Sequence, residues 1–232
     1  MMKKLSLLTL LVLLLCAACD KPAPKPTPET PDTPDTPAVP PSNPEKVWRA
    51  KTMTIDATDY TKWVYLNFAS GELIEVMDPI NDLSWDLGLH RYDFKTNGGS
   101  SGKGQGAAVR ISKQKSLTAE IPTPADDQWI LDREGLLLMN FVNNGDGNHQ
   151  TKYEMQMANF LLSSECDGLG GFTNKGIITQ EGMPPQVYID NAIFLIRTAS
   201  GEIARLRVHD YQNNKKVRGH ITIEYAILVD KK

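Results

Sequence analysis

The sequence predicts an all-β fold with little helix, and two observations carry that prediction. From residue 51 onward, short runs rich in β-branched and aromatic residues alternate with turn-forming residues. No segment combines a sustained helical period with capping residues at both ends. We therefore expect a single β domain over residues 46–232, large enough for one hydrophobic core and holding at most one short helix.

The expected strands share a short, apolar-rich pattern bounded by turn residues. They lie at 51–56, 63–68, 72–76, 107–111, 152–162, 192–198, 202–208 and 220–229. Ser70-Gly71 and Ala199-Ser200-Gly201 each separate two of these runs, which predicts tight connections between neighbouring strands. Over 203–208 one face is apolar and the other is mixed, as in a half-buried strand.

Composition narrows the possible functions. The formal net charge is -3, so a clustered basic face for binding nucleic acid is not expected. Cys166 is alone in the β domain, which excludes an internal disulfide framework, and its surroundings read as a polar, glycine-rich loop. No serine elbow, carboxylate pair or histidine pair at metal-ligand spacing is recognisable, so we expect no catalysis.

Residues 1–18 read as an export signal. Two lysines precede an apolar run, Leu5–Leu15, that is too short to span a membrane comfortably. Small residues then lead to Cys19, and this resembles the lipobox of bacterial lipoproteins, which implies cleavage before Cys19 and acylation of it. Cys16 is the alternative, but a bulky leucine precedes it where a small residue is preferred.

The segment 19–45 is rich in proline. Proline fixes φ and removes the amide donor, so this segment can form neither helix nor sheet. It should sample extended polyproline II at roughly 3.1 Å per residue. We expect a tether that lifts the β domain away from the lipid anchor.

Two glycine-rich segments suggest ligand sites that their context does not support. Residues 98–106 lack both the phosphate-loop spacing and a following helix, so a turned β connection is expected. Residues 144–148 supply one carboxylate and no later glutamate, so a hairpin loop is expected rather than a calcium site. His90 and His209 stand near strand ends beside charged residues, and we expect them to make structural hydrogen bonds.

Methionine is the more informative residue type. Strand alternation places Tyr153, Met155 and Met157 on one face, where methionine is ordinarily core filler. Met183 stands in an irregular loop with one glycine and two prolines, which is harder to explain as core. His149 follows the glycine-rich loop, free to meet a ligand. Thioether sulfur is a soft ligand that suits haem iron.

Three stretches resemble the HmuY family of haem-binding lipoproteins. They are NDLSWDLGLHRYDFKTNGGSSGKGQGAAV at 81–109, TIDATDYTKWVYLNFASGE at 54–72 and IFLIRTASGEIARLRVHDYQ at 193–212. With the last strand, the similarity covers nearly all of residues 50–228, and the first stretch is long and idiosyncratic. The chain is therefore identified as a member of that family with an HmuY-like all-β domain.

The resemblance implies that hairpins or loops of the second half grip haem. In some members two histidines hold the iron, and in others methionines do. Here the first family histidine falls on His149, and the second falls near Met183, where no histidine stands. The resemblance thus implies Met183 as one axial ligand. For the other we expect Met157, with Met155 and His149 as alternatives.

The resemblance also implies a place and a partner. Haem would be the cargo of an outer-membrane lipoprotein displayed at the cell surface, in part released, that passes it to a TonB-dependent outer-membrane transporter. The alternative is an adhesin or glycan-binding lipoprotein on the same tether. In that case Trp129 and Tyr188 would supply stacking surfaces.

Overall fold

The computed structural model describes residues 45–111, 116–143, 149–182 and 185–231, all within one compact unit, Asn43–Lys232. The signal segment, Cys19, the tether up to residue 44 and Met183 lie outside the described residues, as do the side chains at 141–143 and 149. The all-β prediction is confirmed: the described chain has fifteen strands and one 3-10 turn, η1 (Asp126–Gln128). Nothing helical in this part of the chain has the length and apolarity needed to cross a membrane.

The largest sheet has five antiparallel strands in the order β1-β15-β14-β13-β6. Their bounds are Lys46–Asp56 for β1, Arg218–Asp230 for β15, Ile203–Gln212 for β14, Ile193–Arg197 for β13 and Ala107–Ile111 for β6. The sequence predicts all five. β1 begins earlier than expected because it pairs with β15 along its whole length, from Lys46 opposite Asp230 to Asp56 opposite His220.

A four-stranded sheet in the order β3-β2-β4-β5 packs against the larger one. Its strands are β2 (Val64–Asn67), β3 (Glu72–Ile74), β4 (Leu87–His90) and β5 (Asp93–Thr96). Hydrophobic side chains from both sheets, among them Leu66, Leu89, Phe194 and Tyr225, form one buried cluster. The main core therefore lies between these two sheets.

Residues 97–106 form scaffold rather than a ligand loop. Asn97 is fully buried and donates two hydrogen bonds from Nδ2 to backbone carbonyls. A Cβ added at Gly98 would overlap the backbone of Gly106, so the chain can approach itself there only because both positions lack a side chain. The predicted turned connection between two strands, β5 and β6, is confirmed.

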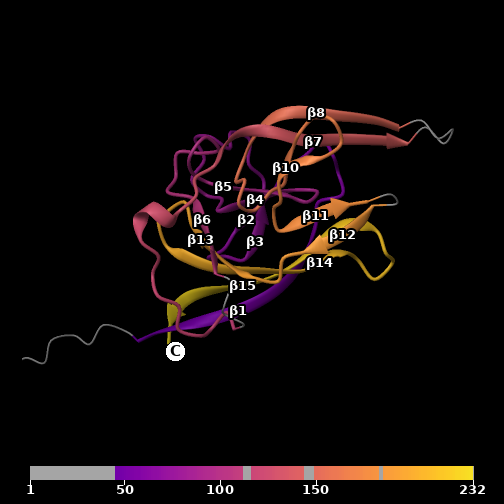
Figure 1. Cartoon of the computed structure of the whole chain (residues 1–232). Helices are drawn as coiled ribbons and strands as arrows, with labels where there is room; N and C mark the ends of the chain where they lie inside the picture. The colour runs from indigo at the N-terminus through magenta and orange to yellow at the C-terminus, as the bar shows by residue number, and fades with distance from the viewer. Residues whose placement is uncertain (1–44, 112–115, 144–148, 183–184, 232) are drawn as a thin grey trace, which may run out of the picture. The chain divides into compact units, whose positions relative to one another are not determined.

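Three hairpins complete the domain. They are β7 (Arg133–Asn143) with β8 (His149–Ala158), β9 (Glu165–Cys166) with β10 (Phe172–Asn174), and β11 (Ile178–Glu181) with β12 (Gln186–Ile189). Figure 1 shows β7–β8 along the top of the view and β11–β12 below it, with the connecting ends of both hairpins on the same side. The β7–β8 and β11–β12 hairpins adjoin the two segments in which the sequence predicts ligands of the iron, His149 and Met183.

Candidate functional site

A cleft of about 730 Å³ opens between the β7–β8 and β11–β12 hairpins. Small-molecule sites typically have volumes of about 300–1,000 Å³. Segments far apart in sequence line it: Tyr60, Arg91, Tyr92, Leu138, Thr151, Tyr153, Cys166, Gly170, Gly171, Phe172, Gln180, Glu181, Gly182, Pro185 and Arg218. A second cleft, of about 690 Å³, lies beside β1 and β15, and no residue next to Met183 or His149 lines it, whereas Gly182, Pro185 and Thr151 line the first cleft. The first cleft is therefore the candidate site.

One wall of the cleft is a face of the β7–β8 hairpin. Tyr153 stands opposite Leu138 in the strand register, and both line the cleft together with Thr151. Leu137, the neighbour of Leu138, points the other way and is fully buried against Ala158 and Phe160. The hairpin thus presents one face to the cleft and fixes the other to the body of the domain.

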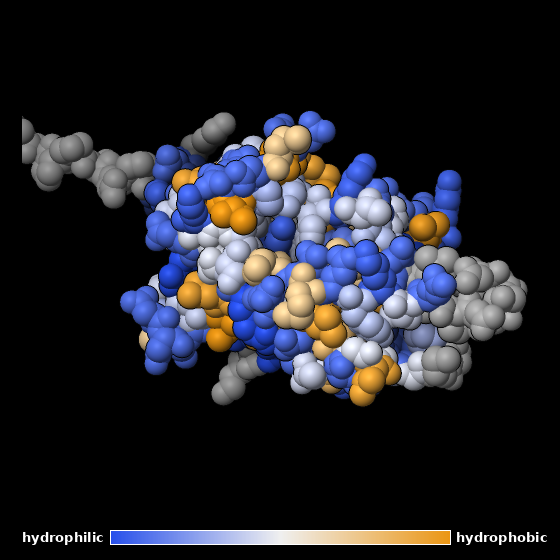
Figure 2. Space-filling model, turned by 90° about the horizontal axis from the view of Figure 1, so that it is seen from above, coloured by the Kyte–Doolittle hydropathy of each residue, from blue (hydrophilic) through white to orange (hydrophobic). Residues whose placement is uncertain are grey.

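Met155 and Met157 follow Tyr153 on this strand but do not line the cleft. Met155 and Met157 are 54% and 38% exposed, so neither is core filler. At about 3.3 Å per residue, Met157 lies roughly 13 Å along β8 from Tyr153. On the face seen from above, the hydrophobic groups of the described residues are small and separate from one another (Figure 2).

The opposite wall belongs to the β11–β12 hairpin. Gly182 and Pro185 line the cleft and flank Met183 in the sequence, although Met183 itself is outside the described residues. On the first wall, β8 begins at His149, two residues before Thr151, and its side chain also lies outside the description. The chain segments that carry these two predicted ligands therefore border one cleft.

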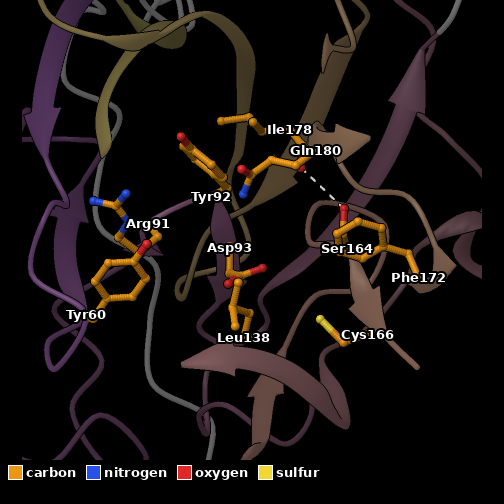
Figure 3. A pocket seen from close by; sticks show the side chains of 10 residues that line it. All are labelled: Tyr60, Arg91, Tyr92, Asp93, Leu138, Ser164, Cys166, Phe172, Ile178 and Gln180. Atoms are coloured by element: carbon orange, nitrogen blue, oxygen red, sulfur yellow. Dashed lines mark hydrogen bonds between the residues drawn. The ribbon is translucent and has the colours of Figure 1, made fainter. Parts of the chain in front are cut away.

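The floor of the cleft narrows into a recess of about 40 Å³. Figure 3 shows Tyr60 and Arg91 on one side of the recess, Cys166 and Phe172 on the other, and Tyr92 in between. The loop predicted around Cys166 is wrong in detail, because this residue lies in β9 and is buried. Burial raises the pKa of its thiol to about 12, so the sulfur stays protonated at neutral pH.

Two arginines mark one end of the cleft. The Arg91 guanidinium lies 4.2 Å from the centre of the Tyr60 ring, and its Nη1 donates to the carbonyls of Thr58 and Arg218 at 3.1 and 3.2 Å. Arg218 contacts the Pro185 carbonyl at 3.5 Å through Nη2. Other arginines of the domain, such as Arg110, pair with carboxylates, whereas neither Arg91 nor Arg218 has an ion pair among the described residues.

The remaining predicted candidates have structural roles. His90 is buried and its Nε2 lies 2.9 Å from the Tyr60 carbonyl, while His209 bonds Glu224 at 2.9 Å, so both predictions of structural hydrogen bonding are confirmed. Trp129 is buried beneath the Arg197 guanidinium, which leaves it no free stacking face. Tyr188 is half-exposed but does not line the cleft.

Sequence reasoning missed most of the cleft lining. Arg91 and Tyr92 stand in the recognised stretch 81–109 without an assigned role, and Arg218 reads as part of a solvated basic turn. The sequence signal that could have found the first two is an arginine followed directly by a tyrosine between two short strands, β4 and β5. Their convergence with Arg218 depends on pairing between distant strands, which no local pattern reveals.

Comparison with known proteins gives one matching family and several similar solved structures. The family model described as HmuY protein matches residues 59–225. Similar solved structures include the apo HmuY analogue of Tannerella forsythia (21% identity, 81% of this chain and 98% of that one, TM-score 0.55). A protein described as a lipoprotein of Bacteroides fragilis is also similar (22% identity, 76% of this chain and 89% of that one, TM-score 0.54). One described as an HmuY-like haem-binding protein of Bacteroides vulgatus is also similar (21%, 76% and 90%, TM-score 0.50). No curated protein matches.

Proposed function

Since this chain belongs to the HmuY family, we propose that its β domain binds haem in the cleft between β7–β8 and β11–β12. The carrying observation is the lining of that cleft. Its volume of about 730 Å³ suits a ligand of haem size, and the rings of Tyr60, Tyr92, Tyr153 and Phe172 offer flat apolar surface. The bound haem is cargo, so no catalytic step is assigned.

The two arginines fit the polar edge of the same ligand. Haem carries two propionate groups, and a planar guanidinium matches a carboxylate with parallel hydrogen bonds. Arg91 and Arg218 lie in the cleft lining without carboxylate partners among the described residues. The donor set therefore suits a planar, apolar ring with acidic substituents.

We propose Met183 as one axial ligand of the iron. The cleft-lining positions of Gly182 and Pro185 support this assignment. For the second ligand the sequence favours Met157, with Met155 and His149 as alternatives. Position along β8 supports His149 instead, because it precedes the cleft-lining Thr151 by two residues, whereas Met157 follows Tyr153 by about 13 Å of strand.

We further propose that the protein is anchored at the outer membrane and delivers its haem to a transporter. Lipidation at Cys19 and the tether 19–45 would hold the domain at the outer membrane, displayed at the cell surface. An open cleft lets an outer-membrane transporter of the TonB-dependent class take the haem directly. A thioether ligand favours ferrous iron, so oxidation would ease release.

An absorbance titration with haem tests the proposal. The protein should shift the Soret band, and affinity should rise when dithionite reduces the iron, because thioethers prefer the softer ferrous ion. Met183→Ala should lose the reduced-state spectrum. Met77→Ala is the matched control, since Met77 is 95% exposed and outside the cleft lining. Absence of any spectral change in both redox states would reject haem and favour the adhesin or glycan-binding alternative.

Comparison of three further variants identifies the second ligand. The three variants are His149→Ala, Met157→Ala and Met155→Ala. Two of them should keep the wild-type haem spectrum, and the one that alters it identifies the second ligand. A histidine ligand also predicts weaker binding as pH falls below about 6.5, whereas a thioether has no proton to gain and predicts little change.

A further inference from the structure

The Tyr92 hydroxyl is buried without a protein partner. Tyr92 is 8% exposed and lines both the cleft and its inner recess, and its Oη has no hydrogen-bond partner among the described residues. A buried hydroxyl without a partner costs free energy, so such a group needs an explanation. Burial raises the pKa of Tyr92 to about 12, so this hydroxyl stays neutral at neutral pH and can donate a hydrogen bond to a ligand.

Arg91 and Arg218 both lie within electrostatic range of Tyr92. The Arg91 guanidinium lies 5.7 Å from the centre of the Tyr92 ring, and Tyr211 packs edge-on against the same ring at 6.0 Å. Arg218 in turn lies 6.0 Å from the centre of the Tyr211 ring. Figure 3 shows Tyr92 between Arg91 and Gln180 on the cleft floor. One hydroxyl donor and two guanidinium groups thus share one end of the cleft.

No carboxylate of the cleft lining pairs with either arginine, although the Asp56 carboxylate, outside the lining, lies within electrostatic range of Arg91. Among the described residues neither Arg91 nor Arg218 forms an ion pair, and Glu181, the one acidic residue of the cleft lining, pairs with Lys175. Guanidinium groups without a paired carboxylate beside a buried donor form a site for an anion, and the planar fork of arginine favours a carboxylate.

We infer that Tyr92 and Arg218 form a carboxylate-binding end of the cleft, so that the protein selects porphyrins with free propionate groups. The inference rests on the proposed haem function and deepens it by naming the part of the ligand that is read. Arg91 is a positioning residue, because its Nη1 already holds the Arg218 carbonyl and its guanidinium stacks on Tyr60. Selection at this end is independent of iron, since no axial ligand takes part.

Esterification of the propionates tests the inference, because it removes the charge and leaves the ring. Iron-free protoporphyrin IX and its dimethyl ester are titrated against the purified full-length protein in the same detergent, followed by fluorescence. The free acid should bind at least tenfold more tightly than the diester. Arg218→Gln and Tyr92→Phe should each reduce that ratio at least threefold, with the affinity for the diester unchanged within twofold.

Two matched controls separate the carboxylate contact from general charge and folding. Lys215→Gln removes one positive charge from the turn that precedes Arg218, and Tyr188→Phe removes a hydroxyl outside the cleft, so both should keep the wild-type ratio. Tyr92→Phe should also keep the wild-type melting temperature, because the lost hydroxyl has no partner in the described protein.

The outcomes distinguish this inference from the proposed function. A Soret shift with haem combined with equal binding of acid and diester would overturn the carboxylate end and leave haem binding standing. Equal weakening of acid and diester by Arg218→Gln would also overturn it, since the residue would then act on the fold. Failure of haem itself to bind would remove the proposed function and the inference together.

Discussion

Two neighbouring leucines of β7 should respond in opposite ways to the same substitution. Leu137 is fully buried and packs with Ala158 and Phe160, whereas Leu138 is half-buried and lines the cleft. Leu137→Ala should therefore lower the stability of the domain without removing a ligand contact. Leu138→Ala should weaken haem binding with a small effect on stability.

The magnitudes follow from burial. Truncating a fully buried leucine costs about 2–5 kcal/mol, and the small cluster around Leu137 has few atoms that could fill the space, so we expect about 3 kcal/mol. For a domain of this size that lowers the melting temperature by roughly 10 °C. Leu138 is only half-buried, so its truncation should cost less than that of Leu137, about 1–2 kcal/mol.

The assay pairs urea unfolding of the haem-free protein with haem titration under conditions where each variant is folded. Leu73→Ala is the control for a leucine truncated on an exposed strand outside the cleft. Equal losses of stability in the two β7 variants would refute the orientation of the hairpin. So would unchanged haem affinity in Leu138→Ala together with reduced affinity in Leu137→Ala.

Three further predictions test the scaffold and the cleft floor. Burial lowers the pKa of Lys95 from 10.5 to about 8, so the unfolded chain holds this proton more tightly than the folded one. The free energy of unfolding, measured with urea and compared with that of Lys95→Met, should therefore rise by about 2–3 kcal/mol as pH increases from 8 to 10. A decrease over that window would contradict the burial. Cys166, with its thiol pKa raised to about 12, should resist iodoacetamide at pH 8.5 until urea unfolds the domain, and rapid labelling of the native protein would count against it. Gly98→Ala should cost at least about 2–3 kcal/mol relative to Ser100→Ala, because its Cβ overlaps the backbone of Gly106; near-equal melting temperatures would show that the connection can relax.

The strands that sequence predicts best are those with one exposed face. In β14 the alternation over Ile203–Val208 is visible because one side is apolar and the other is mixed. β4 and β5 escape prediction because all eight of their residues are buried, polar ones included, so no alternation remains to be read. β11 and β12 are four residues each, and the glycine and prolines between them mask the pairing.

The candidate site is only partly accessible to sequence reasoning. Alternation correctly groups Tyr153, Met155 and Met157 on one strand face, but it carries no information on where along β8 the cleft ends. That boundary depends on the opposite hairpin and on Arg218, which reaches the cleft through the pairing of β15 with β14. Contacts between distant segments decide which members of a face meet a ligand.

The most recognisable stretch contributes both to the scaffold and to the cleft. Asn97 and Gly98 hold a tight connection together, whereas Arg91 and Tyr92 line the cleft. Met183 stands in the sequence between β11 and β12, in a connecting segment where substitution is cheap for the fold.

A crystal structure of the protein with haem tests the central claim most directly. We expect the porphyrin to lie between β7–β8 and β11–β12, with the Met183 sulfur on the iron and the propionates at Tyr92 and Arg218. Haem in the second cleft beside β1 and β15, or iron held without Met183, would contradict it.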